Sequence, residues 1–375
     1  MARMAPPLDV CIRGAGIVGR TLALLLARER LRVGLVDTAP ATTGATSDVR
    51  AYALNAASRQ LLEMLRAWPD AAHATPVSGM EVYGDDGGEV TFGAQAQGVD
   101  ALAWIVDVAA LQARLGEALR YQPLVETIQA PRPAALTVVC EGRASATREE
   151  FGVLYDVTAY PQRAIAGRVR CEKPHGQVAR QWFDDGGILA FLPLGGSAPG
   201  APGNSAAFVW SVREERADAL LALDAAGFAA ELAQASRHSQ GRLELESDRA
   251  AWPLALARAN RWCGTGWALA GDAAHAVHPL AGQGLNLGLA DAHELAQVLH
   301  DREYWRGVGD EKLLRRYERA RKADVLAMGA ATDGLQQLFA QAAGPWALLR
   351  NWGMKGFERS GPLKQWVARQ AMGRL

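Results

Sequence analysis

The stretch VCIRGAGIVG, residues 10–19, decides the amino-terminal part of the fold. Residues 10–12 form an apolar run of the length of a buried strand, and residues 17–28 carry apolar side chains on several faces, as a buried helix does. A glycine-rich turn separates the two segments. The stretch therefore predicts a strand, a tight turn and a helix in immediate succession.

The glycines of this turn have separate physical tasks. Gly14 permits the sharp turn, Gly16 lets a pyrophosphate approach the main chain, and Gly19 lets the helix pack closely on the strand. The first helical residues, Ile17 and Val18, carry main-chain N–H groups that no helical carbonyl accepts, and these groups attract phosphate. All five residues are therefore predicted to bind a dinucleotide.

An acidic residue follows at the spacing that this fingerprint requires. The apolar run of residues 33–36 predicts a second strand, and Asp37 stands at its end, about 20 residues beyond the glycines. A carboxylate in this position binds ribose hydroxyls of either NAD or FAD. The sequence contains no second complete fingerprint, which argues against a reductase with separate FAD and NAD domains.

A second glycine-containing segment, WALAGDAAH at residues 267–275, lies far downstream. Its apolar start predicts another buried strand, which places Gly271 and Asp272 at the carboxyl end of that strand. Open α/β sheets bind ligands at this edge, where an acid can hydrogen-bond a ribityl or ribose hydroxyl. Together the two segments favour FAD as the dinucleotide.

The residues that follow are predicted to contact the isoalloxazine ring of FAD. A helix with leucines along one face begins near residue 284, and its amino terminus can stabilise negative charge on the reduced flavin. Glycines at this start let a flavin lie against the main chain. The candidate contacts are Pro279, Gly282, Gln283, Gly284, Leu285 and Asn286.

The bulk composition excludes several other classes of protein. The chain has 375 residues, 49% of them hydrophobic, which is enough for a large core. Lys and Arg number 40, as do Asp and Glu, so a formal charge of zero gives no electrostatic case for nucleic acid. The cysteines, at positions 11, 140, 171 and 263, are too scattered for a redox pair or a zinc site, and we expect no metal. No signal peptide is visible and no apolar run approaches the roughly 20 residues of a membrane span, so we expect a cytoplasmic protein.

These motifs resemble those of a known enzyme family. The second glycine segment and the residues after it look like the second FAD motif of the single-component FAD-dependent aromatic hydroxylases. Residues 48–54, with Arg50, resemble the family's arginine segment beside the flavin, and residues 108–112, with Gln112, its glutamine-bearing helix start. The chain is most similar to the ubiquinone-biosynthesis hydroxylases, which act on polyprenylated phenols. The resemblance runs from Ala5 to the end of the chain.

The resemblance implies a mixed α/β fold, in which a Rossmann-like FAD-binding domain is interleaved with a β-sheet substrate domain and followed by C-terminal helices. The FAD-binding domain would comprise residues 1–75, 106–160 and 255–335, the substrate domain residues 76–105 and 161–254, and the helical tail residues 336–375.

The resemblance also implies a reaction. NADH or NADPH, bound transiently, would reduce FAD, and O2 would then form a flavin hydroperoxide that hydroxylates a phenolic ring, such as that of a ubiquinone precursor. Because the flavin supplies the difficult chemistry, we assign no catalytic residue.

The middle of the chain departs from the family's pattern. Where the family has Asp-Gly, this sequence has Glu141 followed by Gly142, and the added methylene moves the carboxylate. The stretch of residues 121–137 is also shorter than the insert usual there. These departures leave open a non-catalytic flavoprotein accessory in quinone biosynthesis, and the shared fold leaves open an FAD-dependent reductase or halogenase.

Several single residues admit two interpretations. Arg50 is either a contact of flavin or substrate or a solvated arginine, and Gln112 either bonds FAD or caps a helix. His275 either takes part in catalysis or satisfies main-chain groups after its strand.

The carboxyl-terminal segment also admits two interpretations. Trp346, Trp352 and Trp366 lie there among basic side chains. They either pack a helical tail on the body or place it at the inner membrane, where tryptophan lies at the headgroup level and cations meet anionic lipid. The sequence leaves the oligomeric state open.

Overall fold

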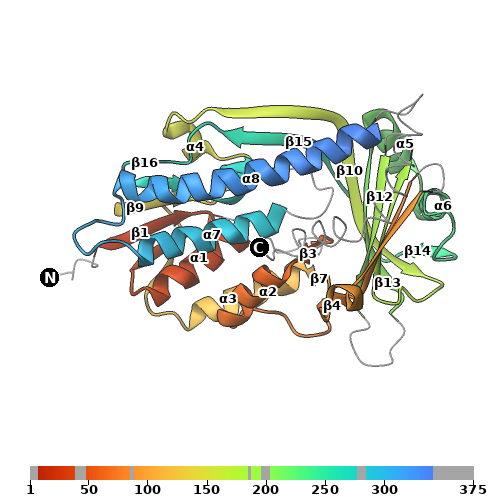
Figure 1. Cartoon of the computed structure of the whole chain (residues 1–375), viewed down its shortest axis with the longest axis horizontal. Coiled ribbons are helices and arrows are strands. Elements are labelled where there is room, and N and C mark those ends of the chain that lie inside the picture. Colours follow the sequence, from red (N-terminus) through yellow and green to blue (C-terminus); the bar gives the residue numbers. More distant parts are fainter. Residues whose placement is uncertain are drawn as a thin grey trace.

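The computed structural model of the chain describes residues 7–38, 48–84, 88–184, 187–195, 203–276 and 284–340. The predicted first strand and helix are confirmed as β1 (Leu8–Arg13) and α1 (Ile17–Arg28), which meet at the glycine turn (Figure 1). The mixed α/β class predicted from the sequence is likewise confirmed, because strands and helices alternate along the chain.

A six-stranded sheet forms around β1. Its order is β16-β17-β9-β1-β2-β8, and all neighbours are parallel except β16 and β17. The inner strands of such a sheet are covered on both faces, which is why β2, for example, is a continuous apolar run, whereas the edge strand β8 is partly exposed. Its other strands are β2 (Val33–Val36), β8 (Val125–Ile128), β9 (Ala134–Val139), β16 (Cys263–Gly264) and β17 (Trp267–Leu269).

Long helices pack beside this sheet. α1 contacts both α3 and α7, and α8 lies along α7 (Figure 1). The apolar face that predicted a helix after residue 284 is buried along α7. None of the described helices combines the length and the apolar character that a membrane crossing requires. The bounds are α2 (Ala56–Met64), α3 (Val108–Arg120), α7 (Gly284–His300) and α8 (Glu311–Ala340).

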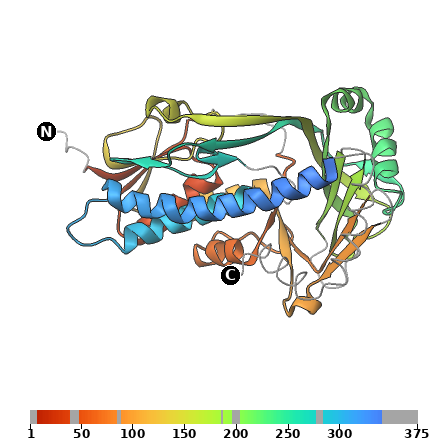
Figure 2. The same ribbon diagram turned by 45° about the horizontal axis from the view of Figure 1, so that its top comes forward.

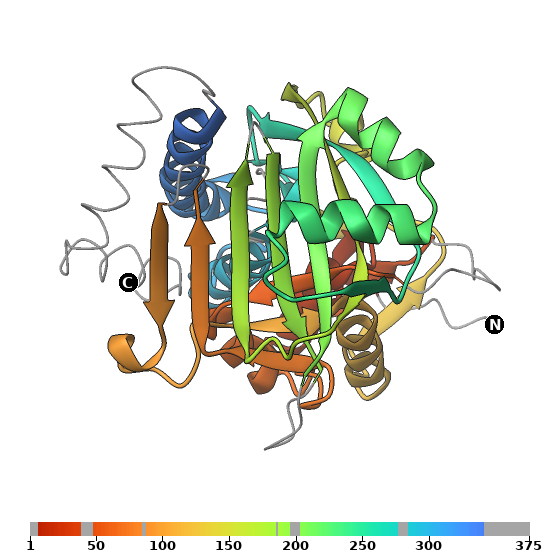
Figure 3. The ribbon, with the colours of Figure 1, turned by 90° about the vertical axis from the view of Figure 1, so that its right-hand side faces the viewer.

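A second, nine-stranded sheet follows the order β18-β15-β10-β13-β12-β11-β5-β6, with β14 paired to β10. It is antiparallel except where β5 pairs with β11, and helices α5 and α6 cover its outer face (Figure 3). The strands are β5 (Gly79–Tyr83), β6 (Glu89–Gly93), β10 (Tyr155–Cys171), β11 (Val178–Asp184), β12 (Gly187–Leu194), β13 (Ser205–Arg213), β14 (Leu243–Leu245), β15 (Ala250–Ala259) and β18 (His275–Ala276), and the helices are α5 (Glu214–Ala222) and α6 (Ala225–Ala235).

The long strands β10 and β15 belong to both halves of the molecule. They pair antiparallel and run side by side from the first sheet to the second (Figure 2). Tyr155, at the start of β10, packs on the core of the first sheet, whereas Ile165 lies in the core of the second. Their register shifts between Ala159 and Arg163, beside the domain boundary predicted at residue 160. The division into domains itself stays a prediction.

A three-stranded antiparallel sheet of β3 (Ala51–Leu54), β7 (Ala103–Asp107) and β4 (Ala74–Val77) joins the two halves. α3 begins directly after β7, where the Asp107 carboxylate accepts the N–H groups of Ala109 and Ala110. Such a side-chain cap fixes the start of a helix. The remaining short elements are α4 (Ala146–Glu150), η1 (Gln95–Gln97) and η2 (Gly271–Ala273).

Candidate cofactor and substrate site

The main chain of the amino-terminal turn has the geometry that its glycines predict. At Gly14 φ is +110°, and a Cβ there would lie 2.5 Å from the carbonyl oxygen of Cys140. A Cβ on Gly19 would lie 1.9 Å from the carbonyl oxygen of Gly14, so strand and helix approach as closely as main chains can. A Cβ on Gly16 would meet nothing within 4 Å. The first turn of α1 therefore faces space that an anion can enter.

Asp37 lies in a cavity of about 360 Å³ at the carboxyl end of β2. Its carboxylate is 3.5 Å from Nη2 of Arg20. The same guanidinium donates to the carbonyl oxygen of Ala15 at 2.6 Å and to that of Gln112 at 3.3 Å. The structure thus brings Asp37 beside the glycine turn and places the main chain of Gln112 there too. Arg20 is not among the residues predicted from the sequence, although a cation directly after the third glycine is a usable signal.

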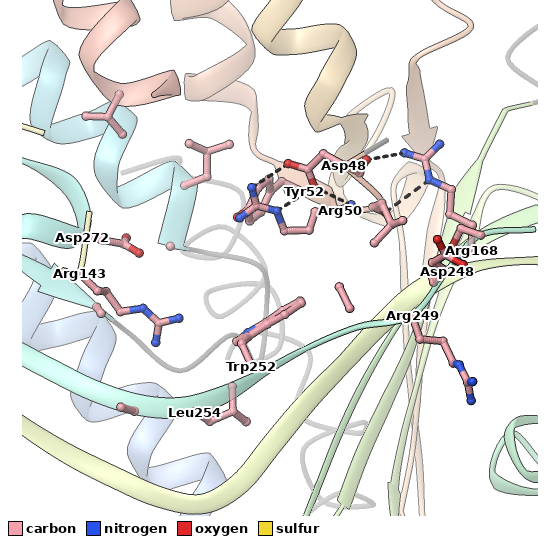
Figure 4. A pocket seen from close by; sticks show the side chains of 18 of the residues that line it. Asp48, Arg50, Tyr52, Arg143, Arg168, Asp248, Arg249, Trp252, Leu254 and Asp272 are labelled. Atoms are coloured by element: carbon pink, nitrogen blue, oxygen red, sulfur yellow. Dashed lines mark hydrogen bonds and ion pairs between the residues drawn. The ribbon is translucent and has the colours of Figure 1, made fainter. Parts of the chain in front are cut away.

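A second cavity, of about 860 Å³, lies between the helices of the first sheet and the large sheet (Figure 4). Predicted cofactor residues from four segments meet in it: Val18, Arg50, Asp272, and Gly284 with Leu285. Ile17, by contrast, is buried in the core below the turn. The opposite wall belongs to β15, which contributes Trp252, Leu254 and Ala255. One cavity therefore joins the predicted cofactor residues to the predicted substrate sheet.

Contacts from three distant segments hold the turn η2 at the edge of this cavity. The N–H of its first residue donates to Oδ2 of Asp291 at 2.8 Å. The hydroxyl of Tyr155 donates to the carbonyl oxygen of Asp272 at 2.7 Å, and Nη1 of Arg148 donates to that of Ala273 at 3.2 Å. Burial raises the pKa of Tyr155 to about 12, so its hydroxyl keeps the proton it donates.

The Asp272 carboxylate itself faces the cavity, opposite Trp252 (Figure 4). The protein walls around it raise its pKa by burial, against the attraction of His275 and Arg143. A carboxylate in this position has the placement that hydrogen bonding to a ribityl hydroxyl requires.

Behind the turn lies a buried ionic cluster that the sequence does not predict. Asp291 on α7 is 0% exposed, His275 2% and Arg321 on α8 5%. Oδ2 of Asp291 lies 2.7 Å from Nε2 of His275, and Oδ1 accepts a hydrogen bond from Nε of Arg321 at 2.8 Å. Burial raises the pKa of Asp291, but His275 and Arg321 outweigh it and hold this pKa below its usual range. The only signal in the sequence is one charged residue on the apolar face of each helix.

Of the two interpretations of His275, the structure favours the structural one. Its ring stacks on Trp262 with centroids 4.9 Å apart and bonds Asp291 behind the turn. It does not line the cavity beside Asp272.

Arg50 reaches the cavity within a network of paired charges (Figure 4). Its Nη2 lies 2.7 Å from Asp48, and this bond raises the pKa of Arg50. From β10, Arg168 pairs with Asp107 at 2.6 Å and donates to the carbonyl oxygen of Val49 at 3.4 Å. The large sheet is thereby tied to the segment that carries Arg50.

Glu141, the departure from the family's Asp-Gly pattern, braces a loop. It accepts hydrogen bonds from the hydroxyls of Ser145 and Thr147, both at 2.7 Å, and lies 3.2 Å from Nε of Arg13. The loop directs the side chain of Arg143 into the large cavity (Figure 4). Glu141 does not line that cavity, so its contacts serve the fold of the loop.

Asn286 is buried and fastens α7 to the start of α2. Its Nδ2 donates to the carbonyl oxygen of Ala53 at 2.8 Å, and its Oδ1 accepts from the N–H of Asn55 at 3.0 Å and the hydroxyl of Ser58 at 2.7 Å. A contact of Asn286 with the cofactor stays a prediction. The other predicted contacts Pro279, Gly282 and Gln283 lie outside the described residues.

Comparison with known sequences gives a consistent result. The FAD binding domain family matches residues 132–331. The chain is 33% identical to the ubiquinone hydroxylase UbiL of Rhodospirillum rubrum, over 98% of this chain and 90% of that protein. It is 32% identical to the 3-demethoxyubiquinol 3-hydroxylase of Escherichia coli, over 98% and 99%. The chain belongs to the FAD-dependent aromatic hydroxylases. It is a flavin monooxygenase that uses FAD to hydroxylate an aromatic ring.

Solved structures confirm the fold of this hydroxylase. Pseudomonas aeruginosa PqsL in complex with 2-aminobenzoylacetate matches with a TM-score of 0.76 at 22% identity, over 94% of this chain and 100% of that one. The p-nitrophenol 4-monooxygenase PnpA of Pseudomonas putida matches with 0.75 at 17% identity, over 98% and 99%. At such identities the likeness concerns the fold alone.

Proposed function

We propose that this monooxygenase hydroxylates the phenolic ring of a ubiquinone precursor and takes its electrons from NAD(P)H. Two relatives that align over 98% of the chain are named as hydroxylases of ubiquinone or demethoxyubiquinol. The observation that carries the proposal is a single cavity with Asp272 on one wall and Trp252 on the other (Figure 4). A ring held against the large sheet would face the cofactor across this space.

The two cavities fit the two ends of FAD. They lie on either side of α1, because Arg20 lines the smaller one and Val18 the larger one. We assign the ribose of adenosine to Asp37, the pyrophosphate to residues 14–19, and the ribityl chain to Asp272. An extended dinucleotide needs polar groups at both ends and close main-chain approach in the middle, and these segments supply both.

Some residues around the larger cavity can stabilise negative charge. The amino terminus of α7, at Gly284 and Leu285, opens onto it, and Arg143 lines it together with Arg50, which is paired with Asp48. Helix amino termini and cations favour anions, and more so where water is excluded. When bound, FAD supplies the oxygen chemistry. The protein binds and orients the ring, balances charge and excludes water, and we assign no acid or base among its side chains.

The apolar wall of β15 is the proposed contact for the substrate ring. Trp252 stands at its centre, with Leu254 and Ala255 beside it. An indole provides a large flat surface for an aromatic ring. Replacing Trp252 by Ala should therefore raise KM for the phenol and release H2O2 in place of product, while FAD affinity stays the same.

The test is a product assay with the purified protein. NAD(P)H oxidation is followed together with mass-spectrometric detection of hydroxylated product, using a panel of polyprenylated and unprenylated phenols. We expect one hydroxylated product per NAD(P)H consumed for a polyprenylated phenol. NAD(P)H consumption with peroxide alone across the panel would support the reductase alternative. A deletion strain should accumulate the unhydroxylated quinone precursor, which identifies the ring position.

We further propose peripheral contact with the inner membrane through residues 336–375, since a polyprenylated substrate dissolves in lipid. Residues 341–375 lie outside the described part of the chain, so the support is their composition: Trp346, Trp352 and Trp366 among basic side chains. The full-length protein should float with vesicles containing anionic lipid, and a variant with all three tryptophans changed to Ala should not. Flotation of both proteins alike contradicts the proposal.

A further inference from the structure

We propose that Asp291 is a positioning residue for FAD. By accepting the N–H of Gly271, it sets the main chain of the turn that presents Asp272 to the cavity. The proposal rests on the assignment of Asp272 to the cofactor.

Both carboxylate oxygens of Asp291 have hydrogen-bond partners, and the side chain is fully buried. Oδ2 takes the N–H of Gly271 at 2.8 Å and lies 2.7 Å from Nε2 of His275, and Oδ1 takes Nε of Arg321 at 2.8 Å. At 0% exposure the carboxylate has no contact with bulk solvent. Burying a charge pair is expensive and often gives no more stability than an apolar pair of the same size. A cluster of this kind in the wall of a ligand site is therefore better explained by the geometry that it imposes.

That geometry concerns the peptide groups on both sides of Asp272. Asp291 accepts the N–H of Gly271, in the peptide one before that of Asp272, while Tyr155 and Arg148 donate to the carbonyl oxygens of Asp272 and Ala273. Donor and acceptor ends of the turn are thus anchored to different elements. A turn held at both ends cannot rotate its peptides, so the Asp272 carboxylate keeps one direction into the cavity.

The cluster also fixes where the turn lies relative to the helices. Arg321 on α8 pairs with Asp291 on α7 and additionally with Asp324 at 2.5 Å. Its Nη2 reaches the carbonyl oxygen of Leu287 at 3.4 Å. The turn η2, the start of α7 and the middle of α8 therefore share one ionic centre, and the start of α7 lines the same cavity as Asp272.

Replacing Asp291 and Arg321 together avoids leaving the Arg321 charge buried without its carboxylate. In D291L/R321M the acceptor of the Gly271 N–H is lost, whereas in D291N/R321M the Asn carbonyl can still accept it. Both variants should fold, as judged by circular dichroism and melting temperature. We expect FAD to dissociate from D291L/R321M with a Kd raised roughly tenfold or more, the size of one lost charge-assisted hydrogen bond, and D291N/R321M to recover most of this loss.

A double-mutant cycle on FAD affinity shows whether the effect passes through the turn. Adding D272A to D291L/R321M should raise the Kd little further, because the carboxylate is already misplaced. Adding R20A, at the adenosine end, should multiply the Kd by the same factor as in the wild type. The visible spectrum of bound flavin should change alike in D272A and D291L/R321M, and stay unchanged in R20A.

A matched control removes a second charge pair away from both cavities. Arg180 and Glu81, at 2.7 Å between β11 and β5, serve this purpose. E81Q/R180M should leave the Kd for FAD unchanged. The proposal is overturned by an unchanged Kd in D291L/R321M, by equal Kd values in the Leu and Asn variants, or by effects of D272A and D291L/R321M that simply multiply. An unchanged Kd in D272A alone instead overturns the assignment of Asp272 to the cofactor.

Discussion

The two turns that we assign to FAD are built by opposite means. The amino-terminal turn, residues 14–19, is fixed by the absence of side chains: a Cβ at either end would collide with a carbonyl oxygen. The carboxyl-terminal turn, residues 271–273, is fixed by side chains that come from far away in the sequence, namely Asp291, Tyr155 and Arg148. Steric exclusion fixes the conformation of the first turn, and hydrogen bonds fix that of the second.

The difference decides how each turn responds to change. A turn fixed by steric exclusion tolerates no added atom. It has no charge to titrate, so its conformation should not depend on pH. A hydrogen-bonded turn tolerates conservative replacement but depends on the protonation of its partners. The following predictions break or sharpen this contrast, in order of falling effect.

The steric turn is tested most severely at Gly19. Gly19→Ala places a Cβ 1.9 Å from the carbonyl oxygen of Gly14, so β1 and α1 must move apart. We expect a loss of about 3 kcal/mol or more in the free energy of unfolding and no flavin after purification. Gly16→Ala is the matched control, since its Cβ meets nothing within 4 Å. It should unfold like the wild type, within about 0.5 kcal/mol, yet bind FAD more weakly. Equal unfolding energies for the two variants would refute the steric account.

Replacing Glu141 tests the hydrogen bonds that hold the loop carrying Arg143 and Arg148. Glu141→Ala leaves the hydroxyls of Ser145 and Thr147 without their acceptor, and we expect unfolding to become easier by about 2 kcal/mol. Burial raises the pKa of Glu141, but these hydroxyls and Arg13 outweigh it, so the folded-state pKa is lowered. The contribution is therefore complete at neutral pH and is lost as the pH falls through this lowered pKa.

The free energies of unfolding of Glu141→Ala and of the wild type, measured by denaturation at decreasing pH, should therefore converge. Glu141→Asp is the informative control, because it restores the family's residue in a loop shaped for the longer one. It should lose about 1 kcal/mol, the value of one hydrogen bond. A gain in stability would mean that the loop does not need the added methylene.

Replacing Asp272 should change the stability of the apoprotein and its affinity for FAD in opposite directions. Burial raises its pKa, so its ionised form is disfavoured in the folded apoprotein, and the penalty is present at neutral pH. Asp272 is exposed to the cavity, where solvent screens this penalty, so Asp272→Asn should melt only slightly above the wild type as apoprotein, and this small difference should vanish as the pH falls and the carboxylate becomes protonated. FAD affinity should fall, roughly tenfold, with the lost charged hydrogen bond. A lower melting temperature at neutral pH would contradict the prediction.

The smallest effect is expected at Arg20. Arg20→Ala removes a partly exposed pair with Asp37 and two bonds to carbonyl oxygens. Such pairs contribute about 0.5–1 kcal/mol, so the Kd for FAD should rise only a few-fold, measured by flavin fluorescence. Arg20→Lys should behave like the Ala variant, because one ammonium cannot reach all three partners. A change of a hundredfold would show that Arg20 touches the cofactor directly.

The same contrast explains what the sequence could reveal. Gly14, Gly19 and Asp37 belong to a local pattern whose meaning does not depend on the rest of the chain, and the predicted strand and helix are confirmed. The strand before Gly271 and the helix after it were equally readable, because apolar periodicity reports burial. The fold class came from the resemblance to the aromatic hydroxylases, and these elements agree with it.

The sequence does not show which residues far apart along the chain form hydrogen bonds with one another. Asp291, Arg321 and Arg148 look like ordinary charged residues of helices until the fold places them behind one turn. The motif that contains Asn286 predicts a cofactor contact, but it gives no sign of the bonds that its amide makes to Ala53, Asn55 and Ser58. Hydrogen bonding between distant segments leaves no periodicity to read.

The shared strands β10 and β15 set a limit on how this architecture can be divided. Each contributes to both halves, and their ladder continues past the register shift between Ala159 and Arg163. A junction that took β10 from one protein and β15 from another would join strands whose pairing on both sides of this shift had not been matched to each other. Neither half can therefore be exchanged as an independent module, and chimaeras with other hydroxylases should join only where they take both strands from one parent.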